Sequence, residues 1–443
     1  MVSKYKTKFK QTEIGMISED WNVKELGNLS DFQYGLGESA QKKGDFVYIR
    51  ITDINSDGFL DRSSLVFMDK EKVKEKYILK KGDVLVARTG ASFGKTYRFN
   101  EDFQATYGGF LIKLLFNKNR IDNNFYFQFS RSKIYWDQAN NLVGGGAQPQ
   151  FNANVLSKMI VPCPGLSEQQ SIAKILSSLD SKIELNQQIN KILEDIGQAL
   201  FKRWFIDFEF PNEEGKPYKS SGGKMVGSEL GEMPAGWEEG CLGDILEISI
   251  SGDWGADNEF EGAIQAISLR GTDLDSLKSN GYAAEAPIRW IRKDRLESRI
   301  VNNCNILIGG SGLGPIGKTI YCSEYLNTLY NFPVTYSNFC KCLTAEMPAF
   351  AIFAEHILEN MYLSGEMNQF YTGTSIPNLD INSLMRYPII IPSKDIVIKF
   401  YDIAIQKFLK LFDKENILLS QIRDSLLPRL MSGRIRVPVE ARA

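Results

Sequence analysis

One segment of the chain has the residue pattern of a nucleotide-binding loop. Residues 312–319 have the sequence GLGPIGKT, which satisfies the phosphate-loop pattern G-x-x-x-x-G-K-[ST] in full. Such a loop needs a helix directly behind it, because the amides at the helix N-terminus hold the phosphates. Here Thr319 is followed by Ile-Tyr-Cys, which has no helical period, and Pro315 removes one amide from the loop. The pattern alone does not establish phosphate chemistry.

An earlier segment is related to this loop. Residues 90–96 have the sequence GASFGKT, which is one residue short of the pattern and continues into a strand-like run, Tyr97-Arg-Phe. Two equivalent loops of different length favour a strand–turn–strand unit over a nucleotide site. A nucleotide-binding enzyme built on residues 312–319 remains an alternative, and ATP hydrolysis that is lost on Lys318→Ala would support it.

The sequence contains few residues that could form a Cys/His metal site. The chain has one histidine, His356, and six cysteines without a C-x-x-C pair. A Cys/His zinc site and a disulfide scaffold are therefore both unexpected. His356 lies in an apolar helical stretch, which favours a structural role. We expect no bound metal and no catalytic residues in this chain.

Basic and polar side chains beside glycines favour DNA recognition instead. Glycine lets the backbone approach a phosphate closely, and arginine can hold a guanine edge through two parallel hydrogen bonds. Any one of these residues can equally be a solvated turn residue. The candidate DNA contacts predicted in this way are Arg50, Arg88, Thr89, Ser92, Lys95, Gln148, Arg270, Ser311 and Lys318.

The sequence repeats itself once. Residues 13–21 (EIGMISEDW) match residues 229–237 (ELGEMPAGW), and residues 50–54 (RITDI) match residues 270–274 (RGTDL). In each copy, short β-like runs broken by Gly, Asn and Asp turns precede one long helical pattern. A chain of 443 residues is also too long for one ordinary domain. The collinear matches predict two similar halves fused head to tail.

Apolar residues seven positions apart predict a seam between the two long helices. An apolar repeat that continues over about five heptads is typical of helices that pack along their length. We expect Ser167 to cap the first helix in a capping box, and Asn186 to fix the register of the seam at a cost in stability. Two separate amphipathic helices, each on its own domain, remain an alternative. The predicted seam residues are Ile172, Leu179, Asn186, Leu193, Leu200, Ile398, Ile405, Phe412, Leu419 and Leu426.

This order of elements resembles the specificity subunits of type I restriction–modification systems. The resemblance covers essentially the whole chain. It rests on the paired openings that end at Trp21 and Trp237, the two Gly-Lys-Thr turns, the Gly…Pro…Asn run before each helix, the ALFKRWF helix end at 199–205 and the LLPRLMSG ending at 426–433. Arg88 aligns with Gly310, and Gln148 aligns with Ile376, so equivalent contacts in the two halves are not expected.

The resemblance implies an α+β fold with a pseudo-two-fold internal repeat. Two mixed, strand-rich target recognition domains would be separated by two long antiparallel helices that form a coiled coil. The implied segments are target recognition domain 1 (1–165), a central helix (166–210), a linker (211–227), target recognition domain 2 (228–393), a distal helix (394–433) and a tail (434–443).

The resemblance also implies partners. Each recognition domain would read one half of a split double-stranded DNA site, while the subunit docks two modification (methyltransferase) subunits that restriction subunits join. S-adenosylmethionine, ATP and Mg would belong to those partners, and this chain would hold no cofactor. A third interpretation is a structural coiled-coil adaptor, which sequence-specific DNA binding would contradict.

Charge and hydropathy are compatible with this interpretation. Residues 1–165 carry 24 Lys and Arg against 18 Asp and Glu, whereas residues 211–393 carry 13 against 23. Phosphate contacts must therefore come from local patches. No apolar run approaches the roughly 20 residues that cross a bilayer, and the first ten residues are basic but lack the apolar stretch of a signal peptide. We expect a cytoplasmic protein.

Overall fold

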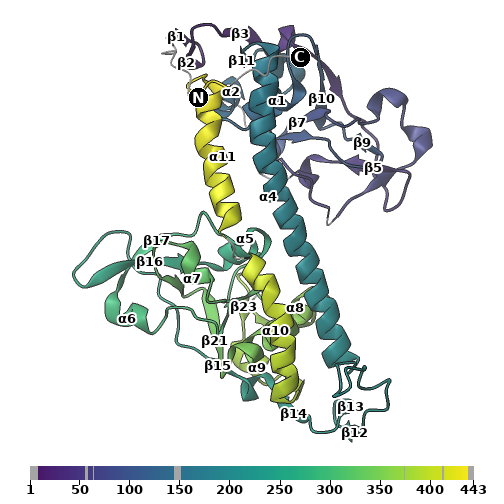
Figure 1. Cartoon of the computed structure of the whole chain (residues 1–443), viewed down its shortest axis with the longest axis vertical. Helices are drawn as coiled ribbons and strands as arrows, with labels where there is room; N and C mark the ends of the chain where they lie inside the picture. The colour runs from purple at the N-terminus through teal and green to yellow at the C-terminus, as the bar shows by residue number, and fades with distance from the viewer. Residues whose placement is uncertain are drawn as a thin grey trace. The chain divides into compact units, whose positions relative to one another are not determined.

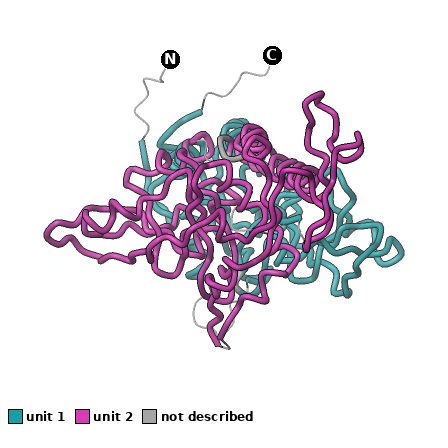
Figure 2. Tube along the Cα trace, turned by 90° about the horizontal axis from the view of Figure 1, so that it is seen from below, with its two compact units in different colours: residues 1–182, 419–443 teal, residues 183–418 magenta. Residues whose placement is uncertain are grey.

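The computed structural model describes residues 8–54, 58–62, 64–143, 151–373, 375–411 and 414–437. The chain forms two compact units (Figure 2). Unit 1 comprises Met1–Lys182 and Leu419–Ala443, and unit 2 comprises Ile183–Leu418. Unit 1 is thus assembled from both ends of the chain, whereas unit 2 is one continuous stretch.

Unit 1 is built on two small sheets with the strand orders β4-β10-β7-β8 and β6-β5-β9 (Figure 1). Its strands are β1 (Phe9–Thr12), β2 (Gly15–Ser18), β3 (Asn22–Glu25), β4 (Ser30–Tyr34), β5 (Phe46–Ile49), β6 (Phe67–Met68), β7 (Val84–Ala87), β8 (Thr96–Arg98), β9 (Ala105–Tyr107), β10 (Leu111–Phe116) and β11 (Ile160–Cys163). Its short helices are α1 (Asn123–Phe129), α2 (Lys133–Val143) and α3 (Ala153–Ser157).

Unit 2 has sheets with the strand orders β15-β21-β18-β19 and β17-β16-β20. Its strands are β12 (Met225–Ser228), β13 (Gly231–Pro234), β14 (Glu238–Cys241), β15 (Leu246–Ile248), β16 (Ala263–Leu269), β17 (Ile288–Arg292), β18 (Asn305–Gly309), β19 (Thr319–Tyr321), β20 (Val334–Tyr336), β21 (Cys340–Ala345), β22 (Tyr371–Thr372), β23 (Asn378–Leu379) and β24 (Pro388–Ile391). Besides the long seam helices it contains α5 (Leu274–Asn280), α6 (Lys293–Glu297), α7 (Leu326–Leu329), α8 (Pro348–Ser364) and α9 (Ile381–Met385).

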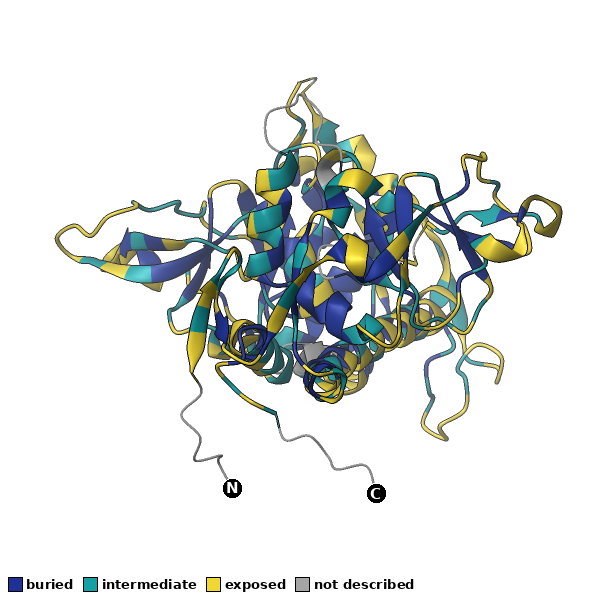
Figure 3. Cartoon of the chain, turned by 90° about the horizontal axis from the view of Figure 1, so that it is seen from above, coloured by how far each residue is buried: buried dark blue, intermediate teal, exposed yellow. Residues whose placement is uncertain are grey.

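The two units repeat the same topology, as the sequence predicts. The four-stranded sheets correspond strand for strand, and each three-stranded sheet combines one antiparallel pair with one parallel pair, β5·β9 in unit 1 and β16·β20 in unit 2. Strands β5 and β7 are buried along their whole length, which fits their runs of apolar residues. Figure 3 shows the buried residues concentrated on strands and inner helix faces.

Both Gly-Lys-Thr segments are strand–turn–strand units. Strand β18 pairs antiparallel with β19, and Ile308 lies opposite Thr319. In unit 1, β7 pairs antiparallel with β8, and Val86 lies opposite Thr96. A strand follows each turn where a phosphate loop requires a helix. The prediction against a nucleotide loop at residues 312–319 is confirmed.

The central helix α4 spans Leu166–Phe201 and continues into a π-helical turn, Lys202–Ile206. The predicted capping box is wrong, because the helix already includes Ser167. The amide of Gln169 donates to the carbonyl oxygen of Gly165 at 3.0 Å, so the helix begins at Leu166, two residues earlier than an N-cap at Ser167 would allow. The Ser167 carbonyl accepts a hydrogen bond from the Ser171 hydroxyl at 3.0 Å.

Within unit 1, α4 packs antiparallel against α11 (Glu415–Met431). Ile172 and Leu176 share one core with Leu427 and Leu430, and further along α4 the carboxylate of Asp180 reaches α11. The two helices therefore run in opposite directions. The predicted helix pairing is present in this unit.

Within unit 2, the pairing continues in the same antiparallel sense with α10 (Lys394–Leu411) and the start of α11. Asn186 contacts Asn416, while the end of α4 brings the ring of Phe201 to within 6.1 Å of the Phe400 ring. Phe400 also lies 5.2 Å from the His356 ring on α8. The helices of unit 2 are thus held partly through α8.

The seam differs in detail from the heptad prediction. Ile172 and Asn186 are buried; Ile398 is wrong as a seam residue, because 39% of its surface is exposed. The buried positions of α10 are Val397, Phe400 and Ala404. Phe412 lies outside the described residues. The remaining predicted seam residues are partly buried: Leu179, Leu193, Leu200, Ile405, Leu419 and Leu426.

Polar contacts occupy the middle of the seam in each unit. In unit 2, Asn186 Nδ2 donates to Glu415 Oε2 and to Asn416 Oδ1, both at 2.8 Å. In unit 1, Arg423 of α11 lies 3.5 Å from the Asp180 carboxylate of α4. Gln128 and Arg131, which lie outside the seam helices, donate to the same carboxylate at 2.7 Å. Directional bonds of this kind select one register more strictly than apolar contacts do. This is the role that the sequence predicts for Asn186.

The distal segment differs from the predicted helix over 394–433. Lys414 lies in a turn between α10 and α11, and residues 412–413 lie outside the described part of the chain. None of the helices formed by the described residues is both long enough and apolar enough to span a bilayer.

The segment after α11 closes unit 1. Ile435 and Val437 pack on the unit 1 core, and the Arg436 guanidinium bridges two acidic side chains. Its Nε donates to Glu168 Oε1 at 2.7 Å, and one terminal nitrogen donates to Asp20 Oδ2 at 2.9 Å. Burial raises the pKa of Asp20, but bonds from Ser18 and Arg436 outweigh it, so the pKa lies below its ordinary value.

We predict that Arg436→Ala destabilises unit 1 by about 1–2 kcal/mol, because it removes charge-assisted bonds from a buried Glu168. The difference from the unmodified chain should persist above pH 4 and shrink as the pH falls through the lowered pKa of Asp20, since protonation ends that pairing. Urea unfolding at several pH values measures this. Arg434→Ala, at an exposed neighbouring position, is the control. Equal midpoints for the two variants at neutral pH would contradict the prediction.

Candidate nucleic-acid interface

Two of the predicted DNA contacts, Arg50 and Arg270, use their side chains for hydrogen bonds within the fold. Arg50 bonds Asp53 at 2.7 Å and the Ser64 carbonyl at 2.9 Å. Arg270 forms the same arrangement with Asp273, at 2.8 Å. The hydrogen bond to the aspartate raises the pKa of each arginine above its ordinary value. Both guanidinium groups are committed to closing a turn.

In unit 2, Lys318 and Ser311 lie on the turn after β18. Lys318 forms an ion pair with Asp275, and Ser311 forms a β-bridge with Asn378. The Lys318 side chain is only 23% exposed. Ser311 remains a candidate contact, whereas the charge of Lys318 is already balanced within the unit.

In unit 1, Arg88 is held between two aromatic rings. Its guanidinium carbon lies 5.2 Å from the Tyr34 ring centroid and 5.6 Å from that of Phe110. Among the described residues, its Nε is buried and has no hydrogen-bond partner. Tyr34 is 40% exposed and Phe110 is 57% exposed. This trio, the Arg88 clamp, places an arginine with unused donors between two accessible rings.

The other unit 1 candidates lie on the same turn. Thr89 precedes the short 3-10 helix Gly90–Ser92, and its side chain makes no capping bond. Lys95 has no ion-pair or hydrogen-bond partner for its ammonium group among the residues that the structure describes. Gln148 lies outside the described residues. The turn therefore offers Thr89, Ser92 and Lys95 for contacts.

The equivalent of the Arg88 clamp in unit 2 has a different chemistry. Gly310 takes the place of Arg88, since its amide donates to the Phe339 carbonyl at 2.9 Å as the Arg88 amide donates to that of Phe110 at 3.0 Å. Phe339 is also 57% exposed. Leu313 and Ile376, on adjoining loops of unit 2, are 85% and 66% exposed. One unit presents a cation between rings where the other presents apolar side chains.

The sequence patterns do not predict the aromatic residues of this surface. Tyr34 lies on β4, opposite Ile112 of β10, while Phe110 directly precedes β10. Their proximity to Arg88 follows from strand pairing, which the sequence does not display. The available signal is Phe110 itself, a large apolar residue directly after two glycines.

Nothing in the described part of the chain assembles a metal site. No group of three or more His, Cys, Asp or Glu side chains there is placed to hold an ion. Burial raises the pKa of Cys340 to about 12 and that of Cys163 to about 11, so these thiols stay protonated. His356 is fully buried, and its Nδ1 lies 2.8 Å from the Ile352 carbonyl oxygen. A structural role for His356 agrees with these contacts.

A model of one known protein family matches the chain twice. A sequence model described as the type I restriction modification DNA specificity domain matches residues 18–222 and again residues 234–427. The chain belongs to this family. The two matches divide the sequence as the internal repeat does.

Relatives of similar length support the assignment. The type I restriction enzyme MjaIX specificity subunit of Methanocaldococcus jannaschii is 27% identical over 449 residues, covering 98% of both chains. The HindI specificity subunit of Haemophilus influenzae is 25% identical and covers 94% of this chain and all of that protein. The crystal structure of a type I restriction–modification S subunit from M. genitalium has a similar fold, with a TM-score of 0.55, 18% identity, and coverage of 97% of this chain and 99% of that one.

We predict that Arg50→Ala lowers the free energy of unfolding by about 1–3 kcal/mol, because it leaves the Asp53 carboxylate buried without its main partner. The side chain of Asp53 is 1% exposed. Lys95→Ala is the matched control on the same unit and should change the free energy of unfolding by less than about 0.5 kcal/mol. Chemical denaturation of the full chain measures both. If Arg50→Ala leaves the free energy of unfolding unchanged, the structural role is contradicted. Arg50 would then again be a candidate DNA contact.

Proposed function

We propose that this chain is the DNA-reading specificity subunit of a type I restriction–modification complex and that each unit reads one half of a bipartite site. One observation carries the proposal. The two units share the same pair of sheets, but they present different side chains at the equivalent turn. Equivalent scaffolds place the two turns in equivalent local settings, while different side chains allow the two half-sites to differ. The chain contributes recognition and no catalysis.

The Arg88 clamp supports base reading by unit 1. Arginine forms paired hydrogen bonds with the O6 and N7 acceptors of guanine in the major groove. Rings on both sides restrict the guanidinium, which reduces the entropy lost on binding. In unit 2, the exposed Phe339 and Leu313 suit apolar contacts such as the thymine methyl group. We therefore propose a guanine in the half-site of unit 1.

Partner docking is supported by apolar side chains on α4. Within unit 2, Leu185, Ile192 and Ile196 are each at least half exposed, and their spacing of seven and four places them along one helix face. We propose that modification subunits, two per chain, cover such faces and that restriction subunits join them. S-adenosylmethionine, ATP and Mg would be bound by those partners, and the complex would act on DNA in the cytoplasm.

The alternatives have no specific support. A nucleotide-binding enzyme is contradicted by the hairpin at residues 312–319, in which Lys318 is paired with Asp275. A structural adaptor accounts for the helices but not for two strand-rich units that each present exposed rings. DNA recognition accounts for both features.

We predict that replacing residues 1–165 with the corresponding domain of another family member changes one half-site and leaves the other unchanged. The physical reason is that the sheets of unit 1 and their turns are built within this range. Methylome sequencing of a host that expresses the complete system measures the result. Replacement of residues 228–393 is the reciprocal control. A change in both half-sites after either exchange would exclude separate reading.

We also predict that the helices set the interval between the half-sites. Removing one heptad from α4 and one from the paired helical segments shortens the connection by about 10 Å. The preferred spacer should then shrink by up to about three base pairs, at about 3.4 Å each. The same methylome measurement detects the change. An active variant that keeps the original spacer would contradict the ruler role.

A further inference from the structure

Three large apolar side chains are exposed on adjoining loops of unit 2. Leu313 lies on the turn between β18 and β19, Ile376 lies on the loop between β22 and β23, and Phe339 directly precedes β21. They are 85%, 66% and 57% exposed, in that order. A group of large apolar side chains on the surface of a soluble domain usually marks a binding site. We call these three residues the apolar patch.

Backbone hydrogen bonds hold the loops of the apolar patch together. The Gly310 amide donates to the Phe339 carbonyl oxygen at 2.9 Å, which ties the turn after β18 to the segment before β21. The Gly312 amide donates to the Pro377 carbonyl oxygen at 3.1 Å, which ties the same turn to the loop that carries Ile376. The fold of unit 2 therefore brings the three loops together.

The turn that carries Leu313 is anchored on its inner side. Ile316 is 5% exposed and belongs to the core of unit 2. Pro315 packs against two glycines, since a Cβ on Gly271 would lie 2.8 Å from the Pro315 Cβ and a Cβ on Gly309 would collide with the Pro315 carbonyl oxygen. One side of the turn is thus fixed while Leu313 is left exposed. A surface that is fixed before binding loses less conformational entropy when a partner covers it.

The corresponding positions of unit 1 carry side chains of another kind. Arg88 stands in the place of Gly310, and Gln148 aligns with Ile376. Arginine and glutamine are the side chains that hold guanine and adenine edges through paired hydrogen bonds. Glycine and isoleucine have no side-chain donors or acceptors, so unit 2 cannot read a base in this way at either position.

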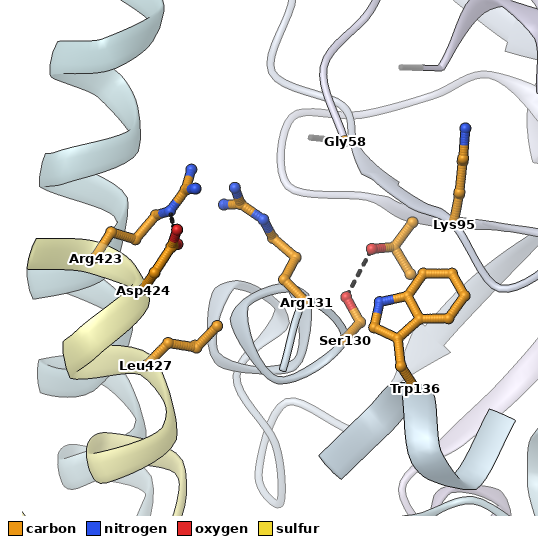
Figure 4. A pocket seen from close by; sticks show the side chains of 9 residues that line it. Gly58, Lys95, Ser130, Arg131, Trp136, Arg423, Asp424 and Leu427 are labelled. Atoms are coloured by element: carbon orange, nitrogen blue, oxygen red, sulfur yellow. Dashed lines mark hydrogen bonds and ion pairs between the residues drawn. The ribbon is translucent and has the colours of Figure 1, made fainter. Parts of the chain in front are cut away.

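The two Gly-Lys-Thr turns also differ in the charge that they present. In unit 1, the Lys95 side chain points away from the guanidinium groups of Arg131 and Arg423 (Figure 4). In unit 2, the equivalent Lys318 is paired with Asp275. Unit 2 therefore neutralises the cation of its turn and presents apolar side chains beside it.

We propose that the apolar patch recognises the 5-methyl group of thymine in the half-site that unit 2 reads. This methyl group is the apolar feature that base pairs present in the major groove, and apolar side chains contact it. The inference deepens the proposed function and rests on it, because it takes DNA as the partner of this surface.

A neighbouring cation favours DNA over an apolar protein surface as the partner. The aliphatic stem of Lys341 lies over Gly310, where an added Cβ would meet the Lys341 Cγ at 3.3 Å. Within the described ranges, the Lys341 ammonium has no ion-pair or hydrogen-bond partner. Apolar side chains with an unpaired cation beside them fit a base edge that is flanked by phosphates.

Uracil tests the proposal, because it lacks the 5-methyl group of thymine and keeps the same hydrogen-bonding edge. The half-site of unit 2 is the one that changes when residues 228–393 are exchanged. Each thymine of that half-site is replaced in turn by uracil, and DNA affinity is measured for the assembled complex. At the contacted position, uracil should weaken binding by about fourfold, the equivalent of about 0.8 kcal/mol for one buried carbon group.

The decisive variant carries Leu313→Ser and Ile376→Ser together, and Leu363→Ser is the matched control. Leu363 lies near the end of α8 in unit 2 and is 68% exposed. The double variant should bind the thymine duplex more weakly and reduce the difference between thymine and uracil to less than about twofold. Leu363→Ser should keep the fourfold difference. Uracil in the half-site of unit 1 should have the same effect on the variant and the unmodified complex.

The proposal is overturned if uracil weakens binding at no position of the unit 2 half-site, or if the double variant keeps the full difference. It is also overturned if the double variant fails to assemble with the modification subunits while Leu363→Ser assembles, because the apolar patch would then be a protein contact. These outcomes leave the proposed function intact. A complex that binds its own site no better than unrelated DNA refutes the proposed function and this inference with it.

Discussion

The contact between α11 and α4 is the constraint on which unit 1 depends. Leu427, Leu430 and Met431 complete a core whose other buried members lie between Ile17 and Leu176. Arg436 then ties the last described residues to Glu168 and Asp20. A recognition domain whose core needs the far end of the sequence cannot be understood as an independent N-terminal module. The helices therefore belong to the folded units as much as they connect them.

The two units share their internal framework and differ in some of their exposed side chains. Arg50–Asp53 and Arg270–Asp273 close equivalent turns with nearly the same geometry. Arg88 is exchanged for Gly310 beside equally exposed phenylalanines. This exchange removes a cation from unit 2, in agreement with the acidic charge of residues 211–393. The copies differ in the side chains of these exposed turns and keep the ion pairs that close the turns at Arg50 and Arg270.

The sequence predicts the repeat, the α+β class and the hairpin nature of both Gly-Lys-Thr segments, because these depend on local patterns. It places Ile398 in the seam because the heptad track of α10 is read one residue out of step with the buried positions Val397 and Ala404. It counts Arg50 as a DNA contact although an aspartate stands three residues later, which is a signal for an internal pair. It misses Tyr34 because strand pairing brings that ring to Arg88.

The noncontiguous make-up of unit 1 affects the order in which the protein matures on the ribosome. Unit 2 is one uninterrupted stretch and can fold as soon as Leu418 has emerged from the exit tunnel. Unit 1 must wait until α11 and Arg436 have been synthesised, although its sheets are translated first. Until then its apolar surface stays uncovered, so nascent chains that stall late in translation should be especially dependent on chaperones.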